Sequence, residues 1–140
     1  MSEFYQQYFC PYCKSYSLII EDNSRVAYAY LLSERSIISD VWLYNQGETP
    51  NKINWNDRND MPFLNPREYI LDNIIPIKYD SDIDLSWIYQ DNLIEVKIYI
   101  RRELIAILRP KLFPSFSLLV CKDGPLAKKW NNDNSYEKNR

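Results

Sequence analysis

The chain has 140 residues, of which 46% are hydrophobic and 26% are charged, and its formal net charge is -2. This balance excludes an intrinsically disordered chain and fits one globular domain with a proper core. A weakly acidic chain is also a poor match for nucleic acid, because domains that bind it usually carry a strongly basic face.

The first third of the chain alternates apolar and polar residues, which is the pattern of half-buried β-strands. Strands are expected at residues 15–21, 25–32 and 37–44, separated by the polar turns 21–24 and 33–35. Three consecutive strands with such short connections predict an antiparallel meander.

A long polar stretch over residues 45–60 interrupts this pattern. It is rich in asparagine and has only two apolar anchors, Ile53 and Trp55. Loops of this length in a compact domain are often functional. A short helix is then expected over residues 66–72, with Asn65 as its N-cap and a proline as its first residue.

The alternation returns in the second half and is most regular in residues 93–101, where Ile and Val alternate with Glu, Lys, Tyr and Arg. We expect this strand to form a hairpin with residues 104–108. A helix beginning at Glu103 is the alternative, because leucine and alanine are good helix formers. The other expected elements are an extended edge at 74–79, strands at 85–90 and 116–121, and a short helix at 125–130.

These elements predict a mainly β fold, with an α+β fold as the alternative. The expected architecture is one antiparallel, meander-like sheet of about six to eight strands with one or two short helices. Residues 1–130 are expected to form a single globular domain, and residues 131–140 a polar tail that frays.

The sequence also bears on location. Residues 1–8 lack the basic and apolar regions of a signal peptide. No run approaches the roughly 18 apolar residues of a transmembrane helix. We therefore expect a cytoplasmic protein with reduced thiols and no membrane partner.

The residue types that common active sites need are scarce. The chain has no histidine, the commonest general base and metal ligand and the usual partner of a serine or cysteine nucleophile. Its two glycines, Gly47 and Gly124, are too far apart for a glycine-rich phosphate-binding loop. We therefore expect neither catalysis nor a cofactor.

The segment Cys10-Pro11-Tyr12-Cys13 has the spacing of a glutaredoxin-like dithiol motif. Redox chemistry at such a motif needs a thiol pKa lowered by a helix N-terminus, whereas the residues that follow are expected to form a strand. A zinc site would need two more ligands, and Cys121 supplies only a third. We prefer two structural thiols, and keep a thiol-redox protein as an alternative function.

An acidic cluster is formed by Asp80, Asp82 and Asp84, which alternate along the chain. The glycine and glutamate that complete a calcium-binding loop are missing. We therefore expect a solvated acidic edge that suits a basic partner.

The strand over residues 39–45 carries an acid beside two aromatic residues. Strict alternation would place Asp40, Trp42 and Tyr44 on one face, opposite the apolar residues of the strand. Such a face has a protein-binding composition. The alternative is that both faces of the strand are covered.

Four segments of the chain, none of them a catalytic signature, share a pattern with a known family. They are Val26–Leu32, Asp40–Asn45, Met61–Pro66 and Lys122–Ala127. On these segments, and from Cys10 to Trp130 overall, the chain resembles small bacterial immunity proteins of contact-dependent growth inhibition and related polymorphic-toxin systems.

The resemblance implies a cytoplasmic protein that binds a cognate toxin C-terminal domain, often a nuclease, and neutralises it by occluding its active site or substrate surface. It implies no cofactor and fixes no binding residue. A non-catalytic adaptor or small-ligand binder is a further alternative. The expected contact residues therefore come from composition, with aromatic anchors and acids that pair with Lys or Arg of the toxin. They are Asp40, Trp42, Tyr44, Trp55, Asp57, Asp60, Asp80, Asp82 and Asp84.

Overall fold

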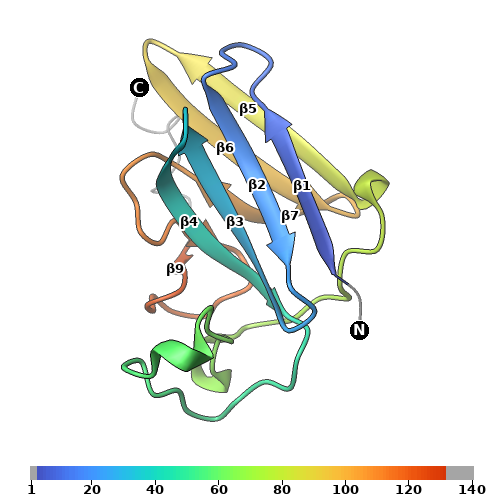
Figure 1. Cartoon of the computed structure of the whole chain (residues 1–140), viewed down its shortest axis with the longest axis vertical. Coiled ribbons are helices and arrows are strands. Elements are labelled where there is room, and N and C mark those ends of the chain that lie inside the picture. The colour runs from blue at the N-terminus through green and yellow to red at the C-terminus, as the bar shows by residue number, and fades with distance from the viewer. Residues whose placement is uncertain (1–2, 132–140) are drawn as a thin grey trace.

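Two β-sheets pack face to face in the computed structural model, which describes residues 3–131 (Figure 1). The first sheet has the order β1-β2-β3-β4 and the second the order β5-β6-β7-β8-β9. All pairs are antiparallel except β8 with β9. The strands are β1 (Phe4–Phe9), β2 (Tyr16–Asp22), β3 (Val26–Ser33), β4 (Ser36–Asn45), β5 (Ile83–Gln90), β6 (Leu93–Ile100), β7 (Glu103–Leu108), β8 (Phe116–Ser117) and β9 (Lys128–Lys129).

The core lies between the two sheets because each strand turns one row of apolar side chains inward. Leu18, Ile20 and Leu31 from the first sheet are fully buried, as are Val96 and Ile98 from the second. The mainly β fold class is confirmed, but the strands form two sheets and not the single sheet expected.

One side of this sandwich is closed by backbone hydrogen bonds. The carbonyl oxygens of Ile38 and Asp40, on the outer edge of β4, accept the N–H groups of Lys111 and Ser115, both at 2.7 Å. The N–H of Trp42 donates to the carbonyl oxygen of Leu126 at 3.0 Å. The sandwich is open on the opposite side, where β1 and β5 are the edge strands of their sheets.

Two expectations about the connections are wrong, and a third holds in part. The helix expected at 66–72 is one 3₁₀ turn, η2 (Arg67–Tyr69), whose N-cap is Pro66 and not Asn65. Residues 74–79, expected to form a short strand or an extended run at a sheet edge, are an extended segment, but they lie outside both sheets. The helix expected at residues 125–130 is absent, and the segment is extended and contains β9, because it bonds to β8 and β4.

The hairpin expected between residues 93–101 and 104–108 is confirmed as β6–β7, and a second hairpin joins β5 to β6. The β5–β6 turn uses Asp91 and Asn92, with φ angles of 54° and 65°. The β6–β7 turn uses Arg101 and Arg102, with φ angles of 48° and 72°, although neither is a glycine or asparagine. These left-handed conformations match the two-residue turns that suit the twist of a hairpin. The polar tail expected to fray lies, from residue 132 onward, outside the described residues.

The long connection between the sheets runs along the lower end of the first sheet and includes η1 (Arg58–Asp60) and η2 (Figure 1). Its anchor is Asn45, buried at the end of β4. The Oδ1 atom of Asn45 accepts the indole N–H of Trp42 and the backbone N–H of Asn65, each at 2.9 Å. Its Nδ2 donates to Thr49 at 3.1 Å and to the carbonyl oxygen of Asn65 at 2.9 Å. The side-chain amide of Asn73 pairs with the backbone N–H and C=O of Asn45.

We predict that Asn45→Ala lowers the free energy of unfolding by roughly 2–4 kcal/mol, because buried groups of Trp42 and Asn65 lose their hydrogen-bond partner. Denaturant titration measures the loss. The control is Asn59→Ala, an exposed asparagine of the same connection, where we expect a change within about 0.5 kcal/mol. Equal stability of the two variants would contradict the anchoring role of Asn45.

Candidate functional site

The expectation that Trp42 and Tyr44 share an exposed face is wrong, because both side chains are fully buried. A bulge at Leu43 breaks the alternation of β4, so Trp42 pairs with Tyr28 while Tyr44 pairs with Ala27 on the opposite face. Neither aromatic ring of β4 is available to contact a partner.

Tyr44 instead helps to close the core. Its hydroxyl donates to Oδ2 of Asp22 at 2.6 Å and accepts the backbone N–H of Ile77 at 2.9 Å. Gln46 donates to the same Asp22 oxygen at 2.8 Å. Tyr44 is therefore a structural group that joins the first sheet to the segment leading into the second.

Asp40 lies where the sequence predicts, on the outer face of the first sheet. It pairs across strands with Tyr30, and Tyr30 stacks on Tyr28 with 6.2 Å between ring centroids. Burial raises the pKa of the Asp40 carboxyl. That carboxylate accepts no hydrogen bond and forms no ion pair within residues 3–131. A cation brought beside it would therefore meet a charge that is partly desolvated and not yet compensated.

The rest of this outer face is aromatic and apolar. Phe4 and Tyr8 of β1 pack against the core, so alternation turns Tyr5 and Phe9 to the outer face, where they are 60% and 59% exposed. Ile37 of β4 is 51% exposed. In Figure 1 the outer face points toward the viewer, and no described element lies over the upper parts of β1, β2 and β3.

The charged side chains that the strands themselves place on this face are all acidic. The strands β1 to β4 contain no Lys or Arg, whereas Glu21 is exposed on β2 and Asp40 lies on β4. Between them Tyr30 is half-buried, and its pKa is raised to about 12, first by burial and then by the charges of Glu21 and Asp40. We define the outer-face patch as Tyr5, Phe9, Ile19, Glu21, Tyr30, Ile37 and Asp40.

The three expected contact residues of the long connection serve mainly to hold it in place. The ring of Trp55 packs edge-on against Phe63, with centroids 5.2 Å apart. Asp57 caps η1 by accepting the backbone N–H of Asn59 at 3.1 Å. The carbonyl oxygen of Asp60 accepts Nη2 of Arg25 at 3.1 Å, although its side chain remains exposed.

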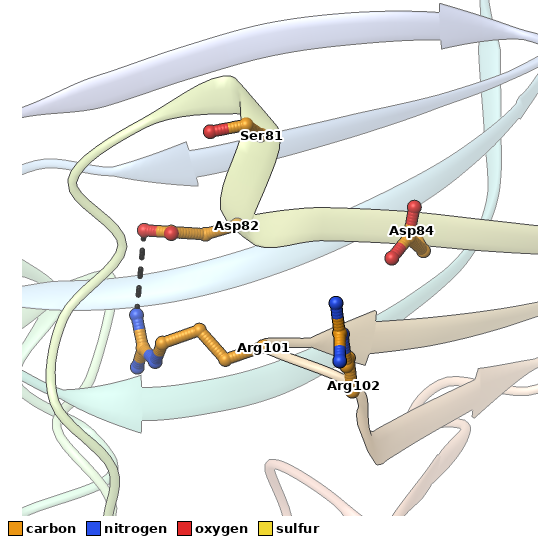
Figure 2. A pocket seen from close by; sticks show the side chains of 5 residues that line it. All are labelled: Ser81, Asp82, Asp84, Arg101 and Arg102. Atoms are coloured by element: carbon orange, nitrogen blue, oxygen red, sulfur yellow. Dashed lines mark hydrogen bonds and ion pairs between the residues drawn. The ribbon is translucent and has the colours of Figure 1, made fainter.

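Two residues of the expected acidic edge, Asp82 and Asp84, line a shallow hollow of about 350 Å³ at the end of the second sheet (Figure 2). Asp82 is fully engaged there, because it accepts the N–H groups of Lys78 and Tyr79 at 3.0 and 3.2 Å and lies 3.4 Å from Arg101. The backbone hydrogen bond from Lys78 is the main cause that lowers the pKa of Asp82.

The remaining acids of the edge differ in their contacts. Asp80, in η3 (Asp80–Asp82), accepts the hydroxyl of Tyr8 at 2.5 Å. Asp84 lies across the hollow from Arg101 and Arg102 (Figure 2). The lining of the hollow therefore carries both signs of charge, so it favours neither an anionic nor a cationic small ligand.

Sequence reasoning missed the role of Arg101. Its guanidinium donates to the carbonyl oxygens of Ile75 and Pro76 and pairs with Asp82. These contacts fix the extended segment 70–79 against the β6–β7 turn. The two consecutive arginines in a predicted hairpin turn were the only signal in the sequence, and nothing local indicated their partners.

The two N-terminal cysteines differ in burial. Cys10 is fully buried at the end of β1, while Cys13 is partly exposed in the β1–β2 connection. The Sγ of Cys13 lies 3.1 Å from Oγ of Ser15. Hydrogen bonds from the side chain and backbone of Ser15 lower the pKa of the Cys13 thiol. The motif leads into β2, so the helix N-terminus typical of dithiol redox sites does not follow it.

Comparisons with protein-family models, with curated proteins and with solved structures give no match. Within residues 3–131, no group of three or more cysteine, aspartate or glutamate side chains is placed to hold a metal ion. No helix in that range is long and apolar enough to cross a membrane. Two features of the described residues remain as candidate functional sites. They are the outer-face patch, as a binding surface, and the Cys13 thiol, as a reactive group.

We predict that Ser15→Ala raises the pKa of Cys13 and moves its alkylation profile to higher pH, because the thiolate loses the hydroxyl donor of Ser15 while the backbone N–H of that residue remains. Iodoacetamide labelling between pH 6 and 9 (roughly bracketing an ordinary thiol pKa of ~8.5), followed by residue-resolved mass spectrometry, measures the profile. Ser17→Ala is the control, because Ser17 bonds to Gln7. Identical Cys13 profiles in all three proteins would contradict the role of Ser15.

Proposed function

We propose that the chain is an immunity-type protein that binds a toxin domain through the outer-face patch. The observation that carries the proposal is the exposure of Tyr5 and Phe9, at 60% and 59%, beside carboxylates with no Lys or Arg on the same strands. The resemblance of the sequence to small bacterial immunity proteins supplies the class of partner. The location that goes with it is the cytoplasm.

The aromatic residues of the patch would act as anchors. Tyrosine and phenylalanine bury a large area with few rotatable bonds, and residues of this kind account for much of the energy in protein interfaces. Tyr30 is held by stacking on Tyr28 before any partner binds. Little conformational entropy is then lost on binding, which favours high affinity.

The acids of the patch favour a basic partner. Glu21 is exposed and would steer association, which depends on ionic strength. The half-buried carboxylate of Asp40 would gain most from an arginine or lysine at the centre of the contact. A toxin that acts on nucleic acid or another anionic substrate has a basic substrate surface of this kind. Covering it blocks the toxin by occlusion, with no chemistry at the immunity protein.

The test is co-expression with the C-terminal domain of the toxin encoded beside this chain. We predict growth rescue by the wild-type protein and a stable complex. Glu21→Arg should weaken the complex by about tenfold or more, because it places a cation against a basic surface. The matched control is Asp84→Arg, which reverses an exposed acid on the second sheet and should change affinity by less than about twofold.

Two results would reject the proposal. The first is no rescue and no complex with the wild-type protein. The second is a complex that Asp84→Arg weakens while Glu21→Arg leaves it intact, because that result would move the contact to the acidic edge of the second sheet.

A further inference from the structure

The outer edge of β1 is an unprotected sheet edge. β1 pairs with β2 in an unbroken register from Phe4 to Phe9, without a bulge. It contains no Lys or Pro, the residues that commonly block pairing at an edge. Within residues 3–131, no strand lies on the other side of β1.

The register shows which backbone groups this edge presents. The N–H of Cys10 donates to the carbonyl oxygen of Tyr16 at 2.9 Å, which fixes the hydrogen-bonded positions of the β1–β2 pair. In an antiparallel pair these positions alternate, so Phe4, Gln6 and Tyr8 bond to β2. The backbone N–H and C=O groups of Tyr5, Gln7 and Phe9 therefore point away from β2.

The opposite edge of the sheet supports this assignment. Carried through β2 and β3, the same alternation predicts that, before the bulge at Leu43, the backbone N–H and C=O groups of even-numbered β4 residues point away from β3. The groups of β4 that bond to the closing segments belong to Ile38, Asp40 and Trp42. The first sheet thus has one satisfied edge and one free edge, and Tyr5 and Phe9 belong both to the free edge and to the outer-face patch.

Acids flank the free edge on both faces of the sheet. On the outer face Tyr5 pairs with Glu21. On the inner face the hydroxyl of Tyr8 donates to the carboxylate of Asp80 in η3. β1 and β2 carry no Lys or Arg. A strand added here would meet Asp80 through its inner row of side chains and Tyr5 and Phe9 through its outer row, with Glu21 one strand further away on β2.

We propose that an extended segment of the toxin domain adds to β1 as a fifth strand of the first sheet. The inference rests on the proposed function and names the mode of recognition. Each of Tyr5, Gln7 and Phe9 supplies an N–H donor and a C=O acceptor, which provide affinity without regard to sequence. Specificity comes from the added side chains, with a Lys or Arg beside Asp80 on the inner face and apolar groups beside Tyr5 and Phe9 on the outer face.

A second copy of the chain fits this edge less well. It would bring a second η3 and a second set of aspartates to the same side of the sandwich, where like charges repel. An extended segment with basic side chains would instead be attracted by the aspartates of η3. The charge around the edge therefore favours the toxin strand over self-pairing.

The position of Cys10 allows a direct test of the backbone. Native chemical ligation at Cys10 joins a synthetic segment 1–9 to the remainder of the chain, so a single amide can be N-methylated. Methylation at Gln7 removes an outward N–H and leaves the bonds to β2 in place. We expect an unchanged fold and a complex with the toxin C-terminal domain that is at least about tenfold weaker. Gln7→Ala, which keeps the N–H, should bind within about twofold of wild type.

If the methylated chain does not fold, two charge-reversal variants test the added strand instead. Asp80→Lys should weaken the complex by about tenfold, because it repels the basic row of the added strand, whereas Asp84→Lys should not. The inference is overturned if N-methyl-Gln7 binds as tightly as the unmodified chain, or if Asp80→Lys and Asp84→Lys behave alike.

Two further outcomes separate this inference from its alternatives. A wild-type dimer that N-methylation at Gln7 converts to monomer would show self-pairing, and it would overturn the toxin strand as occupant. If the wild-type chain binds no toxin domain at all, the proposed function fails and this inference fails with it. If the wild-type chain binds the toxin domain and the edge variants bind it as tightly, strand addition at β1 is rejected while the proposed function stands.

Discussion

The hydrogen bonds of the buried Asn45 side chain fix the long connection that joins the two sheets. Its side chain satisfies the indole of Trp42 and both backbone groups of Asn65, so it holds the long connection against the end of β4. Tyr44 does the same for the segment that leads into β5, through its hydroxyl and the N–H of Ile77. Buried polar groups of this kind must all be paired, and a connection rich in asparagine can fold in this position because Asn45 and Asn73 supply the partners.

This tethering makes the sandwich asymmetric. The closing segments bond to the outer edge of β4, which leaves β1 as the free edge of the first sheet. The exposed aromatic residues Tyr5 and Phe9 lie on that same free strand. The exposed aromatic side chains of Tyr5 and Phe9 and the outward backbone groups of β1 therefore lie together at one edge of the first sheet.

Much of the fold could be predicted from the sequence because alternation is a local signal. The meander β2-β3-β4 and the hairpins of β5, β6 and β7 follow from it, and so does the position of Asp40 on the outer face. Alternation does not reveal long-range choices. The aromatic segment Phe4–Phe9 has no apolar–polar period, so β1 was missed together with the anchors Tyr5 and Phe9. The bulge at Leu43 reversed the expected face of Tyr44, and only tertiary contacts specify such a bulge.

The central claim is that a partner contacts the first sheet and not the second. The most direct measurement is an NMR titration of the labelled chain with the toxin C-terminal domain, following aromatic and isoleucine methyl resonances. The account predicts shifts at Tyr5, Tyr30 and Ile37, with no shift at Ile88, which is partly exposed on β5 of the second sheet. Shifts confined to Ile88 and the neighbourhood of the Asp82 hollow would contradict it.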